Sequence, residues 1–86
     1  MPEISRFYGI VVLMYYIDHA PPHLHARYQD DEVIVAISEL YVMAGSLPPR
    51  ALTLVMDWAL FHQDELLDDW DRASLGEPLV KIRPLD

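Results

Sequence analysis

Residues 7–28 read FYGIVVLMYYIDHAPPHLHARY, and this stretch decides the fold because it holds two strand-like runs around a proline turn. Residues 7–17 are rich in β-branched and aromatic side chains, which predicts a buried central strand with Gly9 at a bulge or close backbone approach. Residues 18–22 are predicted to turn, because consecutive prolines fix φ and cannot donate ladder hydrogen bonds. The chain therefore opens on a strand, a turn and a second strand.

The second strand of this unit is predicted at residues 23–28, where side chains alternate with period two. Such a strand puts His23, His25 and Arg27 on one face and Leu24, Ala26 and Tyr28 on the other. After it we expect a polar hairpin loop at 29–32, a third strand at 33–37, a short fourth strand at 41–44 and a final edge strand at 79–83.

The helical part of the chain is predicted to begin at residues 46–49, because proline is tolerated in the first turn of a helix. Apolar residues recur at three and four from Leu52 to Trp70, the spacing of one helical stripe. Residues 50–75 are one kinked helix or two, with Asp64 able to cap a second segment after a kink near His62. Gly76 is the predicted C-cap.

These elements predict an α+β fold: a small antiparallel sheet of about four or five strands, packed on one face by the helical segment. The 86 residues are expected to form a single domain over residues 1–86. A hydrophobic share of 52 % in so short a chain predicts a small protein partner or a homo-oligomer.

Charge and composition exclude several function classes. Six Lys and Arg against 14 Asp and Glu give a net charge of −8, which argues against non-specific DNA binding but leaves RNA bound in a local basic pocket open. The lack of cysteine excludes disulfides and thiolate chemistry. No apolar run reaches the ~20 residues of a membrane helix, and no secretion signal is visible. We therefore expect a cytoplasmic protein that does not interact with membranes.

Three of the four histidines lie in the segment Asp18-His19-Ala20-Pro21-Pro22-His23-Leu24-His25. On one strand face, His23 and His25 would stand about 6.6 Å apart, close enough to share one ion. His19 or Asp18, folded back by the turn, would supply a third ligand. His19, His23 and His25 are thus candidate ligands for a divalent first-row metal such as zinc.

Acid–base chemistry is an alternative for the same segment. A histidine oriented by Asp18 can remove a proton from a ribose hydroxyl or activate water, while Arg27 neutralises a phosphate. The candidate catalytic residues are then Asp18, His23, His25 and Arg27. In a third interpretation these histidines have no chemical role and only shape a loop.

Other prominent residues have simpler interpretations. We expect Trp58 and Trp70 to be core or interface anchors and His62 to be a helix-surface or capping residue. The acidic residues Asp64, Glu65, Asp68, Asp69 and Asp71 are expected to form a solvated helix face.

The residues also carry a family resemblance. MPEISRFYGI at 1–10, MYYIDHAPPHLHARY at 14–28 and LPPRAL at 47–52, with Trp58, His62, Glu65-Leu66 and Trp70, resemble the bacterial domain of unknown function family 4160. The family motif falls on Asp18, His19, Pro21, Pro22, His23 and His25, and on Arg50 at the helix start.

The resemblance implies a small single-domain protein that is often encoded beside a second small protein of an uncharacterised family numbered 2442. Such a pair is a candidate type II toxin–antitoxin module with this family as the toxin, and no catalytic assignment comes with it. Whether the chain is an enzyme therefore stays open. The alternatives are a metal-binding or metal-sensing protein and a non-catalytic interaction module.

Overall fold

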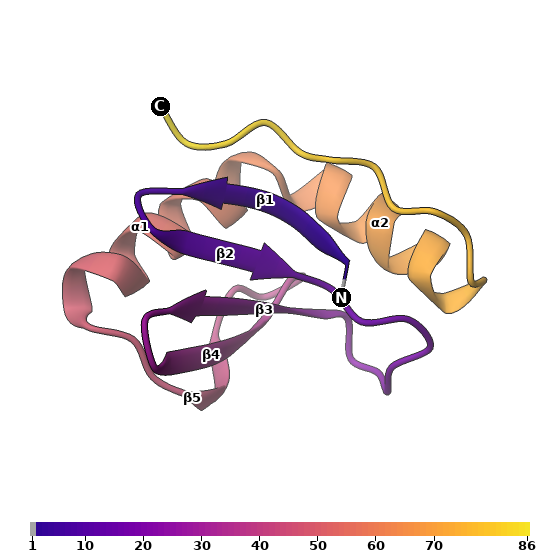
Figure 1. The fold of residues 1–86 in the computed structure, drawn as a ribbon. Coiled ribbons are helices and arrows are strands. Elements are labelled where there is room, and N and C mark those ends of the chain that lie inside the picture. The colour runs from indigo at the N-terminus through magenta and orange to yellow at the C-terminus, as the bar shows by residue number, and fades with distance from the viewer. Residues whose placement is uncertain (1) are drawn as a thin grey trace.

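The chain folds into one antiparallel sheet with two helices packed against it (Figure 1). This is a computed structural model that describes residues 2–86, so Met1, the first residue of the predicted domain, lies outside it. In sheet order the strands are β1 (Glu3–Phe7), β2 (Ile10–Leu13), β3 (His23–Tyr28), β4 (Asp31–Ala36) and β5 (Val42–Gly45), and the helices are α1 (Pro49–Phe61) and α2 (Gln63–Ser74). The predicted α+β class and antiparallel sheet are confirmed.

The prediction of a single strand over residues 7–17 is wrong, because a tight turn at Tyr8-Gly9 separates β1 from β2. Both turn residues have positive φ, +51° and +79°, as in the type I′ turns that join two-residue hairpins. Apolar residues continue on both sides of this turn because both strands contribute to the core, so the hydrophobic pattern has no break. A Cβ on Gly9 would lie 3.4 Å from the Tyr28 ring, an ordinary van der Waals contact, so Gly9 marks a turn and neither a bulge nor a close backbone approach.

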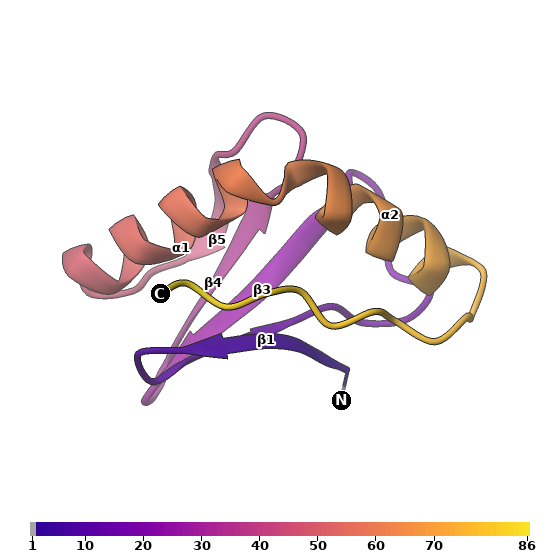
Figure 2. The same ribbon diagram turned by 90° about the horizontal axis from the view of Figure 1, so that it is seen from above.

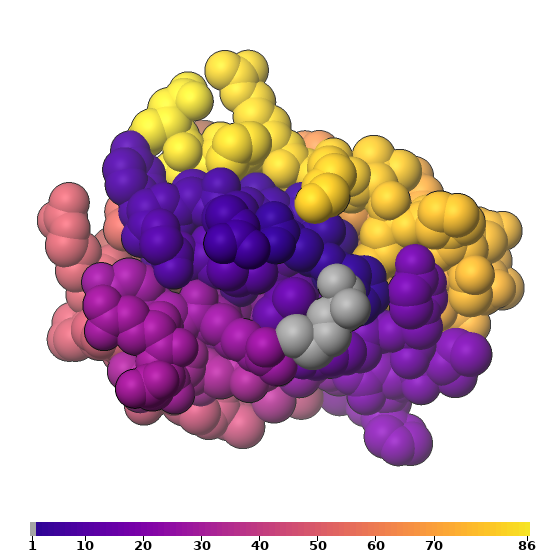
Figure 3. Space-filling model, viewed as in Figure 1, coloured from indigo at the N-terminus to yellow at the C-terminus, as the bar shows by residue number. Residues whose placement is uncertain are grey.

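The predicted edge strand at 79–83 is also wrong. These residues have no regular secondary structure, although they run beside β1, where the Ile82 N–H donates to the carbonyl of Ile4 at 2.8 Å. Pro78 and Pro84 flank the segment, and proline cannot donate to a ladder. In the space-filling view this yellow segment lies against the indigo N-terminal hairpin (Figure 3).

The strand boundaries of the second half of the sheet differ only slightly from those expected. The polar loop shrinks to residues 29–30, because β4 begins at Asp31, and β4 ends at Ala36. β5 runs one residue later than predicted and ends at Gly45. Glu32 therefore belongs to a strand rather than to a loop, and it pairs directly with Arg27.

The helical segment is two helices that meet at His62, which is the C-cap of α1 and the N-cap of α2. Both cover the same side of the sheet (Figure 2). Asp64 lies in the first turn of α2 instead of capping it. At the far end, Gly76 has φ +71° and the Glu77 N–H donates to the carbonyl of Arg72 at 2.8 Å, which closes α2 as the predicted glycine stop.

The core lies between the helices and the covered face of the sheet. Trp58 is fully buried there, its ring 5.4 Å from that of Phe7, and its indole N–H donates to the carbonyl of Arg83. Trp70 is also buried, so both tryptophans are core residues as predicted. Within residues 2–86, neither helix has the length and apolar character needed to span a bilayer.

Candidate metal centre

β3 sends its side chains alternately to two faces, as the period-two pattern predicts. Leu24 and Ala26 point into the core and have no exposed surface. His23, His25 and Arg27 point to the opposite face of β3, which α2 reaches only at the His23 end, through Trp70. Because side chains two residues apart on a strand share a direction, the two imidazoles lie side by side, with ring centroids 5.3 Å apart.

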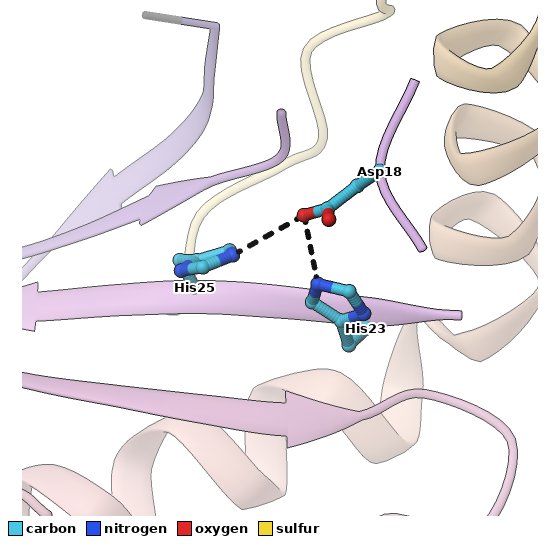
Figure 4. A group of neighbouring side chains, drawn as sticks. All are labelled: Asp18, His23 and His25. Carbon is cyan, nitrogen blue, oxygen red and sulfur yellow. Dashed lines mark hydrogen bonds and ion pairs between the residues drawn. The ribbon is translucent and has the colours of Figure 1, made fainter. Parts of the chain in front are cut away.

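The loop between β2 and β3 brings Asp18 over these rings (Figure 4). Its position is held by backbone hydrogen bonds: the Met14 N–H donates to Pro2, and the Ile17 N–H donates to Ala73 in α2. Ile17 has φ +51°, an unfavourable conformation for a β-branched residue. Strain of this kind persists only where surrounding contacts hold it, and here it directly precedes the carboxylate that faces the histidines.

Asp18, His23 and His25 form a compact cluster, whose potential ligand atoms all lie within 4.8 Å of one another. Asp18 Oδ2 is 2.9 Å from His23 Nε2 and 3.7 Å from His25 Nε2. Both rings thus turn the same nitrogen toward one carboxylate oxygen (Figure 4). The arrangement offers two imidazole nitrogens and one carboxylate to a shared point.

The other nitrogen of each ring is already bound. His23 Nδ1–H donates to the carbonyl of Pro21 at 2.8 Å, and His25 Nδ1–H donates to Glu32 Oε2, also at 2.8 Å. These acceptors take the Nδ1 protons, so Nε2 is the nitrogen of each ring that faces Asp18. Metal-binding histidines have this support, since their second nitrogen usually donates to a carbonyl or carboxylate.

His25 Nε2 is the least satisfied atom of the cluster, because it is buried and makes no hydrogen bond. A buried polar atom without a partner costs on the order of 1–3 kcal/mol. A proton on this nitrogen or a cation beside it would remove that cost. His23 Nε2 differs, because it lies within hydrogen-bond distance of Asp18 Oδ2, at 2.9 Å.

Apolar and aromatic side chains enclose the cluster. In the sheet, His25 pairs with Leu13 on one side and Ile34 on the other. The Tyr15 ring meets His25 edge-on with centroids 4.5 Å apart, and the Trp70 ring lies 5.0 Å from His23. Such surroundings strengthen charge interactions at the two histidines, while the Asp18 side chain stays partly exposed at 26 %.

Burial by these neighbours acts to raise the pKa of the Asp18 carboxyl. Three contacts outweigh it: the backbone N–H of His19, the His23 ring and the nearby charges of His23 and His25. The pKa of Asp18 therefore lies below its ordinary value. The carboxylate is ionised at neutral pH, which is the form that binds a metal ion.

The other predicted site residues lie outside the cluster. His19 is exposed, and its backbone N–H, rather than its ring, contacts Asp18 Oδ1 at 2.8 Å. Arg27 lies further along β3, where its Nη2 donates to the Tyr15 hydroxyl at 3.0 Å and its Nε is 3.4 Å from Glu32 Oε1. The fold thus assembles Asp18, His23 and His25, with Arg27 at the margin.

The sequence analysis did not identify Glu32, whose carboxylate contacts both His25 and Arg27. It also did not identify Tyr15 and Trp70 as the aromatic neighbours of the histidines. A signal for Glu32 was present: a two-residue turn at 29–30 places it opposite Arg27, on the face of the histidines. Trp70 carried no such signal, because only packing brings α2 to this end of the sheet.

The acidic run on α2 departs from expectation at one position. Asp69 is completely buried, and its Oδ1 accepts hydrogen bonds from Arg72 Nη1 at 2.7 Å and from the Val80 N–H at 2.9 Å. The prediction of a solvated face is therefore wrong for Asp69, which ties the C-terminal segment to α2. His62, paired with Glu65 at 2.6 Å, fills the predicted capping position.

Comparison with known families places these residues in context. A family model described as Domain of unknown function (DUF4160) matches residues 9–71, which is most of the chain. The chain belongs to this family. The DUF4160 match contains all three cluster residues and Glu32, but stops before the segment that runs along β1. No curated protein and no solved structure matches the chain.

Proposed function

We propose that this DUF4160 protein binds a divalent first-row metal ion, such as zinc, through Asp18 Oδ2, His23 Nε2 and His25 Nε2. One observation carries the proposal: His25 Nε2 is buried without a hydrogen bond, while the opposite nitrogen of its ring is held by Glu32. A metal ion between the rings and Asp18 gives this lone pair a partner and neutralises the carboxylate.

The donor set supports a reactive rather than a purely structural ion. Structural zinc sites normally have four protein ligands, whereas two histidines and a carboxylate occur in catalytic zinc and non-haem iron centres. Three protein ligands leave at least one position for water, and zinc lowers the pKa of such water to about 7. The chemistry that fits is metal-assisted hydrolysis or binding of an oxygen-donor ligand.

Elemental analysis of protein purified without a histidine tag tests this proposal. We expect equimolar zinc or another first-row metal in the wild type and its loss in His25→Gln and Asp18→Asn. His19→Gln and His62→Gln are matched controls that remove histidines outside the cluster and should keep the metal.

Thermal unfolding gives a second readout. A ligand that binds only the folded state stabilises it by about 2.7 kcal/mol at 100 times its Kd. Added zinc should therefore raise the Tm of the wild type and of both control variants, but not that of His25→Gln. Equal metal content and equal Tm shifts in cluster and control variants would rule out this site.

We propose as a second candidate that the protein is the toxin half of a cytoplasmic two-protein module, with the cluster as its active site. Membership of the family supports this, and the lack of cysteine fits a reducing compartment. The edge strand β5 also suits a small antitoxin-like partner or a second copy, since Val42 and Met43 are exposed there and unpaired edges accept added strands.

A growth assay separates the two candidates. Induced wild type should arrest growth, while a His23→Ala, His25→Ala double mutant that still folds by circular dichroism should not. Normal growth in both cases, with metal bound in the wild type, removes the toxin role and leaves the metal site standing.

A further inference from the structure

A second site lies at the other end of β3 from the histidine cluster. A cavity of about 350 Å³ opens there between the β1–β2 turn, the start of α1 and the C-terminal segment. Its volume falls within the range of small-molecule pockets, about 300–1,000 Å³. The cavity shares no residue with the cluster, so it calls for its own explanation.

The walls of this cavity are largely aromatic and aliphatic. Tyr8 stands on the hairpin turn with 60 % of its surface exposed, and Tyr28 reaches the cavity from the end of β3. Leu54 of α1 and Leu85 of the C-terminal segment complete the apolar lining. Tyr8 occupies a positive-φ turn position where Asn, Asp or Gly is preferred, so local turn chemistry does not account for it.

Arg50 contributes the positive charge at the cavity. Among the described residues, every other lysine and arginine lies within 4.0 Å of a carboxylate: Arg6, Arg27, Arg72, Lys81 and Arg83. Arg50 makes no such contact within residues 2–86, although the chain has 14 acidic residues. The one acidic residue of the lining, Asp86, is 3.6 Å from Arg83.

We propose that this cavity binds a small amphipathic carboxylate, with its apolar body between Tyr8, Tyr28 and Leu54 and its carboxylate on Arg50. Guanidinium binds carboxylate through two parallel hydrogen bonds, and tyrosine rings supply large apolar contact at low entropic cost. This ligand site is separate from the metal centre and does not depend on it.

Titration of ¹⁵N-labelled protein with three matched probes tests the proposal: phenylacetate, the neutral phenylacetamide and the cationic phenethylamine. Phenylacetate should shift the amide signals of Tyr8, Tyr28 and Leu54. It should bind about tenfold more tightly than phenylacetamide, because a hydrogen bond between two charged groups is roughly twice as strong as one to a neutral amide. Phenethylamine should bind most weakly of the three.

Two variants assign the groups. Arg50→Gln should bring phenylacetate down to the affinity of phenylacetamide, whereas Arg6→Gln, an equal charge change at an exposed pair outside the cavity lining, should leave the preference intact. Tyr8→Asn removes the ring while creating an Asn-Gly turn that favours the hairpin, and it should weaken all three probes.

Equal affinity for the acid and the amide in the wild type overturns the proposal. So does an unchanged preference in Arg50→Gln, or an absence of shifts at the three reporter residues at saturating probe. The same spectra show whether each variant is folded, and only folded variants are compared.

Discussion

The core face and the open face of β3 are both buried at the start of the strand, yet they are stabilised in different ways. Leu24 has no exposed surface and needs only close packing. His23 on the other face is 7 % exposed, and each of its nitrogens needs a partner. Burial alone therefore does not mark a functional position. On His25, the buried Nε2 that lacks a hydrogen bond also lies beside a second imidazole and a carboxylate, and this combination distinguishes the cluster.

The largest expected effect is a loss of stability when a side chain on the core face is removed. Leu24→Ala should lower the free energy of unfolding by about 2–5 kcal/mol, because it removes a buried side chain and leaves a cavity. Urea denaturation measures this, and His25→Gln in a metal chelator is the matched variant from the open face, with a smaller expected loss. A greater loss from His25→Gln would mean that the cluster, not the core, dominates the stability of this strand.

A smaller effect is expected on the open face, where Glu32 supports metal binding by His25. Glu32→Gln should weaken metal binding by about 10–100-fold, since groups that hold the second nitrogen of a ligand histidine have effects of that size. Competition against a chelator of known affinity gives the number. Asp30→Asn in the adjacent turn removes a charge without touching His25 and should bind metal normally. Unchanged affinity in Glu32→Gln would leave that carboxylate a purely structural role.

The smallest effect appears at acid pH, with metal removed. The pKa of Asp18 is lower in the folded chain than its ordinary value, so the ionised carboxylate stabilises the fold at neutral pH. That contribution is lost as pH falls below about 4 and through the lowered pKa. The stability difference between wild type and Asp18→Asn should therefore shrink over this range in urea titrations. A constant difference would contradict the depressed pKa.

Much of the fold could be predicted from the sequence, because the patterns that specify strands and helices are local. Period-two alternation assigned the two faces of β3, and the repeat at three and four located the helical segment but left one kinked helix or two open. The errors fall where local signals are weak. No hydrophobic break marks the Tyr8-Gly9 turn, and the extended segment at 79–83 makes one hydrogen bond to β1 without becoming a strand.

The candidate site also has one part that the sequence predicts and another that only the tertiary structure shows. Residue type and alternation alone determined that His23 and His25 share a face, because the direction of strand side chains follows from parity. Only the tertiary structure decided that Asp18 rather than His19 turns inward, that Glu32 fixes His25, and that Asp69 on an acidic helix is buried. These outcomes depend on how a loop, a neighbouring strand and a helix pack, and such contacts join residues far apart along the chain.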